Sequence, residues 1–291
     1  MMTIDNAQLR ALAATIDRGS FDLAAATLHI TPSAVSQRIK ALETSAGRVL
    51  VRRTKPTEIT DAGLPYLRLA RQIDALVQDV VSGSESEARA GVPLAVNSDS
   101  LATWVLPALA GLPDSITFDV RREDEDHSAE LLRAGTVMAA ITTDARPVHG
   151  CSVTRLGSMR YRPMAHPSFA ARWFAAGPTA DALSRAPMVV FDAKDDLQDR
   201  FLRGRSRRPL TPPRHSIPGS ADFAEAVRLG LGWGMVPNQQ ILSGEADGVL
   251  VDLAPGRHID VVLYWQQWTL HTPVLATIYE AIRAAAAEHL D

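Results

Sequence analysis

Cysteine is almost absent from this chain of 291 residues, in which Cys151 is the only one. A single cysteine excludes a disulfide within the chain and a switch between two thiols, which fits a reducing cytoplasm. The chain also lacks any run of about 18 apolar residues, so we expect no membrane span. Its first residues, MMTIDNAQLR, lack the apolar segment of a signal peptide. Together these absences predict a cytoplasmic protein.

Signatures of catalysis are missing as well. We find no G-x-S-x-G, H-E-x-x-H, G-x-x-x-x-G-K or G-x-G-x-x-G segment, and the eight histidines are scattered. We therefore expect no enzyme, no metal site and no cofactor. One enzymatic alternative stays open, a hydrolase that uses Cys151 as its nucleophile together with a distant histidine. Against it, a lone cysteine near a strand is usually a small hydrophobic residue.

Acids slightly outnumber cations in the whole chain, 33 against 30, but a segment near the N-terminus is strongly basic. The net charge of −3 argues against a protein that coats nucleic acid without selectivity. Residues 36–56, however, hold six cations and a single acid, Glu43, for a local net charge of +5. Such a patch can contact phosphates while the rest of the molecule stays acidic.

Residues 20–43 predict two short helices joined by a tight turn. The second helix has an apolar face of Val35, Ile39 and Leu42. Its other face is polar and holds Ser33, Ser36, Gln37 and Lys40. At about 3.6 residues per turn each set forms one stripe. Thr31 suits the N-cap and Pro32 the first helical position. This pattern favours a recognition helix in a DNA major groove, although an ordinary surface helix would also fit it.

A basic hairpin is predicted to follow the second helix. Residues 49–60 contain two β-prone pieces around a turn, which indicates a wing whose cations lie near the DNA backbone or enter a minor groove. A double-stranded DNA operator is therefore the expected partner. The candidate DNA-binding residues are Thr31, Ser33, Ser36, Gln37, Arg38, Lys40, Arg52, Arg53 and Lys55.

A long helix is expected from Asp61 to about Val81. Its apolar positions alternate by four and three, which is typical of a seam that packs against a partner helix. The seam consists of Ala62, Tyr66, Leu69, Ile73, Leu76 and Val80. We favour a dimer, because two helix-turn-helix units one DNA turn apart can read a palindrome. Burial against the protein's own body would explain the same pattern. The polar segment 82–91 then marks a domain boundary.

Strands and helices alternate through residues 92–291, which predicts a mostly parallel, doubly wound sheet. Strands are expected at residues 93–96, 116–120, 137–141, 153–156, 161–165, 188–191, 234–236, 249–253 and 259–265.

The motifs resemble those of the LysR-type transcriptional regulators over the whole chain. The resemblance is carried by AAATLHITPSAVSQRIKALE, by the G-x-x-L-V-R-R and T-D-A-G segments after it, and by GLGWGMVP near residue 230. Within the family, NSDSLATWVLPAL and LVRRTKPTEIT resemble the branch of ArgP and LysG, which control export of basic amino acids. The wing departs from the usual pattern, because Leu50-Val51 replaces Leu-Phe, and we expect only a packing change.

The resemblance implies an α+β multidomain fold. A winged helix-turn-helix domain would span residues 1–60, and a dimerisation linker helix and hinge residues 61–91. An effector domain similar to periplasmic binding proteins would consist of subdomain I (92–163 and 266–291) and subdomain II (164–265), with a cleft between them. Family members are usually homotetramers built as dimers of dimers, so a homodimer or homotetramer is implied. RNA polymerase is left open as a further partner.

The same resemblance implies a regulator whose promoter binding is modulated by a small effector, lysine or arginine, and which controls an amino acid exporter gene. The alternative keeps DNA binding but drops the ligand: an effector-independent protein that acts at a replication origin or as an architectural factor. Dependence of DNA binding on the effector would separate the two.

Effector contacts are expected where strands of the α/β region end, because ligands bind at the carboxyl edge of such sheets. Residues 97–100 precede a helix whose N-terminus favours an anion, here the α-carboxylate. Acids after the second strand would hold the ligand's side-chain cation, and a tryptophan would form a wall of the cleft. Ordinary caps, turns, solvated charges and core packing are the competing interpretations. The candidates are Ser98, Asp99, Ser100, Trp104, Glu123, Asp124, Thr142, Thr143, Asp144 and Asp222.

Overall fold

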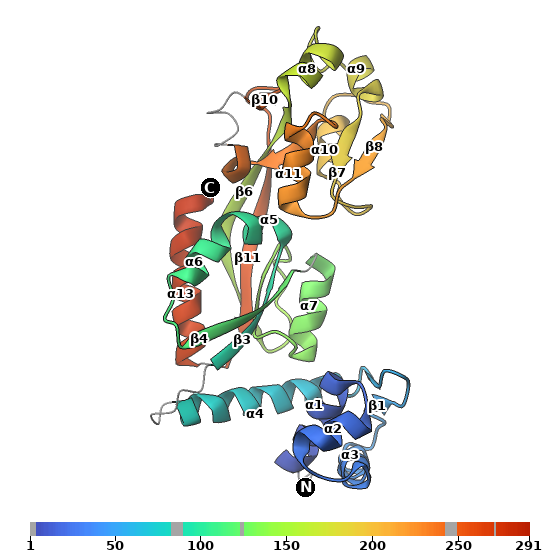
Figure 1. Ribbon diagram of the computed structural model, residues 1–291, viewed down its shortest axis with the longest axis vertical. Helices are drawn as coiled ribbons and strands as arrows, with labels where there is room; N and C mark the ends of the chain where they lie inside the picture. The colour runs from blue at the N-terminus through green and yellow to red at the C-terminus, as the bar shows by residue number, and fades with distance from the viewer. Residues whose placement is uncertain (1–3, 83–89, 123–124, 242–248, 271) are drawn as a thin grey trace.

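The computed structural model describes residues 4–82, 90–122, 125–241, 249–270 and 272–291. Figure 1 shows a helical head, a long helix α4 and an α/β body that rises from α4 in two lobes. The C-terminus lies at the lower lobe, beside the point where the two lobes meet. No helix in the described ranges combines the length and the apolar character that a membrane span requires.

The head consists of α1 (Asn6–Arg18), α2 (Phe21–Leu28) and α3 (Pro32–Ala46). Each helix begins after a side chain that accepts a backbone N–H group, and these caps are Asp5, Ser20 and Thr31. Gly47 ends α3 with φ 65°, a left-handed conformation that glycine adopts without strain. The predicted apolar face of α3 is confirmed, because Val35, Ile39 and Leu42 are all 0% exposed.

The wing pairs β1 (Val51–Arg52) with β2 (Glu58–Ile59) in antiparallel fashion, as predicted but with shorter strands. Glu43, the only acid of the basic segment, fixes the wing to α3. Its Oε1 atom accepts the backbone N–H groups of Leu50 at 2.8 Å and Val51 at 3.4 Å. Leu50 and Val51 are both buried, so the unusual dipeptide packs in the core of the head.

Helix α4 (Leu64–Ser82) begins at Leu64 rather than at Asp61. Among the side chains of α4 that the structure describes, Leu67 and Ala70 are the most buried, each 1% exposed, and they pack in the core of the head. Tyr66, Leu69 and Ile73 of the predicted seam also pack partly against that core. The expected seam is therefore largely occupied within the chain, and among the described side chains of α4 only Leu76 (40%) and Val77 (47%) are large exposed apolar residues.

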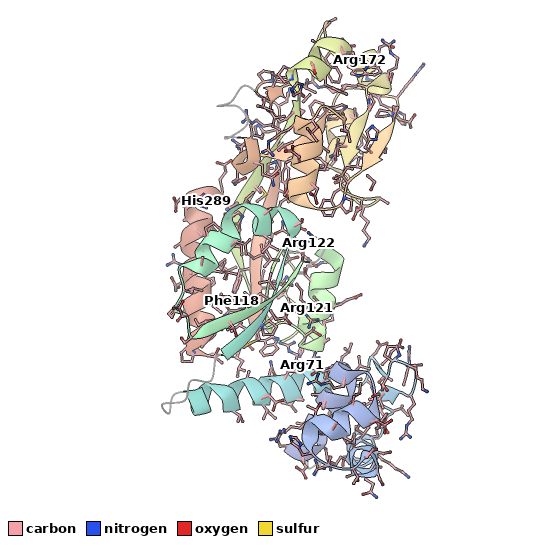
Figure 2. All side chains as sticks on the ribbon, viewed as in Figure 1. Arg71, Phe118, Arg121, Arg122, Arg172 and His289 are labelled. Atoms are coloured by element: carbon pink, nitrogen blue, oxygen red, sulfur yellow. The ribbon has the colours of Figure 1, made fainter. Side chains whose placement is uncertain are left out.

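Two arginines of α4 join the head to the body. Arg68 donates to the carbonyl oxygens of His149 and Gly150. Arg71 donates to the carbonyl of Ala134 and to the hydroxyl of Thr136, both at 2.9 Å, and forms an ion pair with Asp17 of α1. In Figure 2, Arg71 lies on the side of α4 that faces the body. One side chain thus contacts the head and the lower lobe at once.

The main sheet has the strand order β10-β6-β11-β5-β3-β4, and β9 pairs with β6. Its strands are β3 (Ala90–Val96), β4 (Ile116–Arg122), β5 (Ala139–Thr142), β6 (Cys151–Ala165), β9 (Gly234–Pro237), β10 (Val251–Asp252) and β11 (Ile259–Trp268). Only the β3–β4 and β3–β5 pairs are parallel, so the predicted mostly parallel sheet is wrong. The reason is that β6 carries the chain into the upper lobe and β11 returns beside it, in the opposite direction.

Strand β6 is one continuous strand of 15 residues where two short strands are predicted. Gly157 lies inside it because the C-terminus packs there: a Cβ atom at this position would lie 2.7 Å from Cβ of Leu290. The predicted subdomain boundaries at 163/164 and 265/266 fall within β6 and β11. Those boundaries stay a prediction.

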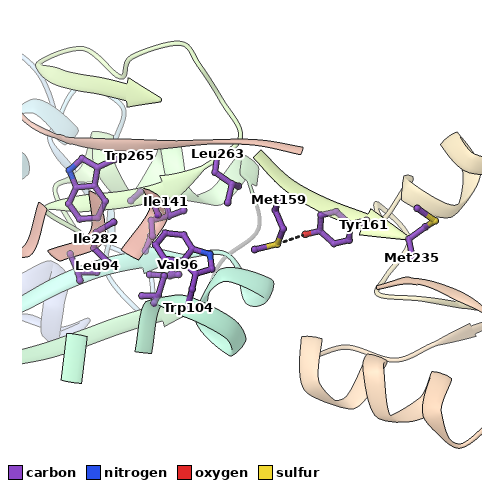
Figure 3. Packing of buried hydrophobic residues seen from close by; sticks show 14 of the residues in the cluster. Leu94, Val96, Trp104, Ile141, Met159, Tyr161, Met235, Leu263, Trp265 and Ile282 are labelled. Atoms are coloured by element: carbon purple, nitrogen blue, oxygen red, sulfur yellow. Dashed lines mark hydrogen bonds between the residues drawn. The ribbon is translucent and has the colours of Figure 1, made fainter. Parts of the chain in front are cut away.

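Helices cover both faces of the lower sheet, with α6 and α13 on one side and α7 on the other (Figure 1). The helical run after β3 comprises α5 (Ser98–Ser100), a π-helical turn (Leu101–Val105) and α6 (Leu106–Ala110). The other lower helices are α7 (Glu125–Ala134) and α13 (Pro273–His289). Between them the core holds Trp104, Val96, Ile141 and Trp265 (Figure 3).

The upper lobe surrounds a second, two-stranded parallel sheet. It contains α8 (Pro167–Trp173), α9 (Ala180–Arg185), β7 (Met188–Val190), α10 (Leu197–Arg203), β8 (Arg214–Ser216) and α11 (Ser220–Arg228). The end of β7 and the start of α11 approach the lower lobe, which positions the cavity described below.

Candidate functional sites

The polar face of α3 is available to an external partner. Ser33, Gln37 and Lys40 are exposed, and Ser36 and Arg38 are half-buried. Thr31 caps the helix, because its hydroxyl accepts the N–H of Ala34 at 3.2 Å. The hydroxyl of Thr31 is thus already used, while the other members of the predicted face can donate or accept hydrogen bonds outside the protein.

The wing continues this surface. Arg52, Arg53 and Lys55 are all exposed. Arg53 is held beside α3, since its guanidinium lies 5.2 Å from the Phe21 ring and Nη2 donates to Ser36 Oγ at 3.5 Å. Arg52 and Lys55 have no partner within the described part of the chain. Unpaired cations beside a polar helix face form a surface that complements a DNA groove and its phosphates.

A cavity of about 410 Å³ lies between the two lobes of the body. Asn97, Ser98, Asp99 and Thr143 line it from the lower lobe, and Tyr161 lines it from β6. The upper lobe adds Phe191 and most of the segment 192–200. The charged side chains of the lining are four aspartates (Asp99, Asp192, Asp195 and Asp196) and two cations (Lys194 and Arg200). The lining therefore has an excess of negative charge.

Asp99 stands where the two lobes meet. Its Oδ2 atom accepts a hydrogen bond from the Tyr161 hydroxyl at 2.6 Å. Burial raises the pKa of Asp99, and hydrogen bonds from the side chains of Ser220 and Tyr161 partly offset this rise. Ser98 links the lobes as well, because its hydroxyl accepts the N–H of Ser220 at 3.2 Å. The start of α5 is thus joined to the start of α11.

Asp195 belongs to a rigid turn after β7. Its Oδ2 accepts the N–H of Phe191 at 2.8 Å, and its Oδ1 accepts that of Leu197 at 3.1 Å. Asp192 supports the same turn by accepting the N–H groups of Lys194 and Asp195. Burial raises the pKa of Asp195, its hydrogen bonds lower it, and the nearby charge of Asp99 adds to the rise. Asp99 thus acts on Asp195, which lines the same cavity from the other lobe.

The structure brings three of the predicted effector residues to the cavity, namely Ser98, Asp99 and Thr143. Ser100 and Trp104 are instead buried at 0% and 1% exposure, because they lie on the face of the helical run that packs on the sheet. Asp222 is exposed on α11 and does not line the cavity. Glu123 and Asp124 lie outside the described residues.

Two further predicted contacts have local roles. The hydroxyl of the buried Thr142 accepts the N–H of Asp144 at 3.2 Å. Asp144 forms an ion pair with Arg146 at 3.0 Å, and the hydrogen bond from Arg146 lowers the pKa of Asp144. These residues build the turn after β5, which was the competing interpretation, and neither lines the cavity.

The segment 191–200 contributes more charge to the cavity than any other and was not predicted from the sequence. The usable signal is its position directly after the strand at residues 188–190, where ligands of α/β sheets bind.

Cys151 does not support a hydrolase. The residue is 9% exposed, and its sulfur lies 3.4 Å from Nη2 of Arg68. Burial raises the pKa of the thiol, with a smaller opposing effect of Arg68. Because the thiolate is the nucleophile, a raised pKa disfavours catalysis. Among the described residues, no group of three or more His, Cys, Asp or Glu side chains could hold a metal ion.

Comparison with known proteins agrees with this two-part organisation. Residues 7–64 match the bacterial regulatory helix-turn-helix protein family of lysR type, and residues 86–287 match the LysR substrate binding domain. The lysine export transcriptional regulatory protein LysG of Corynebacterium efficiens is 44% identical over 283 residues, which are 96% of each chain.

Two solved structures resemble the whole chain. The crystal structure of ArgP from Mycobacterium tuberculosis superposes with a TM-score of 0.93 at 47% identity and covers 99% of each chain. Full-length LysG from Corynebacterium glutamicum, with arginine bound as its effector, superposes with a TM-score of 0.82 at 37% identity. That match covers 98% of this chain and 99% of the other.

Proposed function

This chain belongs to the LysR family of bacterial regulatory helix-turn-helix proteins and is a DNA-binding transcriptional regulator, and we propose that a basic amino acid, lysine or arginine, modulates its binding to promoter DNA. The regulated gene, in this proposal, encodes an amino acid exporter. The observation that carries the proposal is the acid-rich cavity between the two lobes, which has a size suited to a small molecule.

The charge of the cavity favours a cationic ligand. Neither Asp99 nor Asp195 forms a salt bridge within the described residues, and burial raises the pKa of both. A desolvated carboxylate without a cation is costly, and a bound ammonium or guanidinium group would relieve that cost. The relatives are consistent with such a ligand: one is named for lysine export, and another holds arginine as its effector.

The same cavity can bind the α-carboxylate of an amino acid. Asn97, Ser98 and Asp99 lie at the start of the helical run that ends at Ala110, where free N–H groups and the helix dipole favour an anion. Arg200 lines the cavity from the other lobe and can donate to a carboxylate. An α-carboxylate at this end leaves the basic side chain to extend toward the turn at residues 191–197.

On the DNA side, we propose that Ser33, Ser36, Gln37 and Lys40 read base edges. Arg52, Arg53 and Lys55 would bind phosphates and fix the position of the head. We further propose a dimer in which the exposed Leu76 and Val77 of α4 meet a second copy of the chain. Two heads would then face successive turns of the operator.

The proposed mechanism is a shift between two populated conformations. A ligand that contacts both lobes stabilises the conformation in which they approach each other, and it shifts the equilibrium by its difference in affinity for the two states. Because α4 is bonded to the lower lobe through Arg68 and Arg71, a changed arrangement of the bodies changes the spacing of the heads.

A thermal-shift screen against the twenty amino acids tests the proposal. Lysine or arginine should raise the melting temperature, since ligand at one hundred times its Kd stabilises a protein by about 2.7 kcal/mol. Footprinting on the promoter should then change with the same ligand. If no amino acid shifts either the melting temperature or the footprint, the proposal fails and effector-independent DNA binding is favoured.

A further inference from the structure

Two carboxylates face the cavity from opposite lobes. Asp99 lies on α5 of the lower lobe, and Asp195 lies on the turn between β7 and α10 of the upper lobe. Each is held in place by hydrogen bonds from neutral donors: Tyr161 and Ser220 for Asp99, and two backbone N–H groups for Asp195. In the described residues no cation forms a salt bridge with either one.

The number of positive groups on an amino acid determines whether it can neutralise both carboxylates. A neutral amino acid has one positive group, its α-ammonium, and one carboxylate suffices to bind it. A second desolvated carboxylate would then face a neutral side chain, which is unfavourable. Lysine and arginine have two positive groups, so they can neutralise both carboxylates. Asp99 and Asp195 line the same cavity of about 410 Å³ from opposite lobes, so a single small ligand can contact both.

The surroundings assign each carboxylate to one group of the ligand. Asp99 directly follows Ser98, where the proposed α-carboxylate binds, and the two α-substituents of an amino acid share one carbon atom. Asp195 lies on the other wall of the cavity, and hydrogen bonds to both of its oxygens fix its orientation. A carboxylate that is oriented in advance binds a cation without losing side-chain freedom.

Building on the proposed function, we propose that Asp99 binds the α-ammonium group and that Asp195 binds the side-chain cation of the effector. Asp195 is then the residue that selects basic amino acids over neutral ones of the same shape. Asp99 is required for any amino acid.

Binding of arginine and of citrulline, its neutral isostere, to the full chain tests this assignment by calorimetry. We expect Asp195→Asn to lower the affinity for arginine about thirtyfold or more, because one partner of a buried charge pair is lost. The affinity for citrulline should change less than about threefold, so the variant loses the preference for arginine over citrulline. Asp99→Asn should lower the affinities for arginine and citrulline by similar factors. The matched control is Asp199→Asn on α10, whose carboxylate pairs with Arg214 at 2.7 Å outside the cavity and which should leave both affinities unchanged.

A second variant distinguishes loss of the charge from distortion of the turn, because asparagine can replace only one of the two acceptor oxygens of Asp195. Asp195→Glu keeps the charge and should recover part of the arginine preference. Two outcomes overturn the assignment of Asp195. In the first, Asp195→Asn lowers the affinities for arginine and citrulline equally and Asp195→Glu recovers no preference for arginine. In the second, Asp195→Asn keeps the wild-type preference for arginine. If the wild-type chain binds no basic amino acid at all, the proposed function fails together with this inference. If it binds them and Asp195→Asn retains the preference, only the inference fails.

Discussion

The head and the cavity place their functional residues in contrasting ways. The proposed DNA contacts come from one helix and the adjoining wing, residues 31–55, and adjacent turns of α3 bring them together. The cavity draws its lining from residues 97 to 261 and from both lobes. A surface formed by one element follows from local spacing, whereas a cavity between lobes depends on the path of the whole chain.

The two regions also differ in the solvent exposure of their charged side chains. The wing exposes its cations to solvent, so their repulsion is screened and a phosphate backbone can approach them. The cavity withdraws two carboxylates from water, which raises their pKa values and gives a cation a strong advantage. The head is thus suited to long-range attraction of DNA, and the cavity to selection of a small ligand.

The largest expected effect is a loss of stability in the head, which a core substitution should cause without changing ligand binding by the body. Ile39 is 0% exposed in the head core, and Ile39→Ala should lower the free energy of unfolding of the head by about 2–5 kcal/mol. Urea denaturation measures this loss, while the body should still bind its ligand. Leu76→Ala, at a residue 40% exposed, is the control and should cost far less. Equal losses for the two variants would contradict the packing described here.

The connection between the two regions is tested by Arg71→Ala. The variant removes charged hydrogen bonds to Ala134 and Thr136 and the ion pair with Asp17, so we expect a loss of about 1.5–3 kcal/mol. We also expect the promoter footprint to lose its response to the effector, although the ligand still binds. Arg10→Ala on α1 is the control for a change of charge in the head. A variant that keeps the response would show that Arg71 does not couple the two regions.

Within the head, readers of bases and anchors of phosphates should differ. Gln37→Ala should weaken binding to the operator by about 1–3 kcal/mol and leave non-specific binding almost unchanged. Arg52→Ala should weaken both and lower the slope of log K against log salt by about 1. Affinity measurements on operator and random DNA at several salt concentrations distinguish them. Identical behaviour of the two variants would refute this division of roles.

The smallest effect concerns pH. Two hydrogen bonds, of 2.9 and 3.1 Å, join Arg160 to Asp260 across the β6–β11 pair, and they lower the pKa of Asp260. A lowered pKa adds stability above the unfolded value of about 3.9, and that stability is lost as the pH falls through the folded value. Asp99 and Asp195 have raised pKa values and act in the opposite direction: their contribution is present at low pH and lost as the pH rises.

Unfolding of Asp260→Asn at several pH values tests this sign. The variant should be less stable than the wild type by about 0.2–1 kcal/mol at pH 7, since the pair is partly exposed to solvent. The difference should shrink as the pH falls below about 4. Asp119→Asn, whose carboxylate meets Arg121 at 3.4 Å on the surface, is the control and should show little dependence. A difference that grows toward low pH would contradict the sign.

Much of the fold could be predicted wherever a local rule applied. The cap at Thr31 and the first helical position at Pro32 were predicted and are confirmed. Strand positions were also found, but strand direction was not. Alternation of apolar residues identifies the faces of a strand and carries no information about which way the neighbouring strand runs.

The sequence by itself determined the head, because capping residues, helical spacing and clustered charge act over a few residues. Only the tertiary structure decided the cavity. The long strands β6 and β11 carry the chain into the upper lobe and back, and this path brings Asp195 opposite Asp99, almost a hundred residues earlier in the chain. The packing of the helical run on the sheet buries Trp104, and a local hydrogen bond commits Thr142 and Asp144 to a turn. Proximity of this kind depends on how the lobes pack, and no local pattern specifies it.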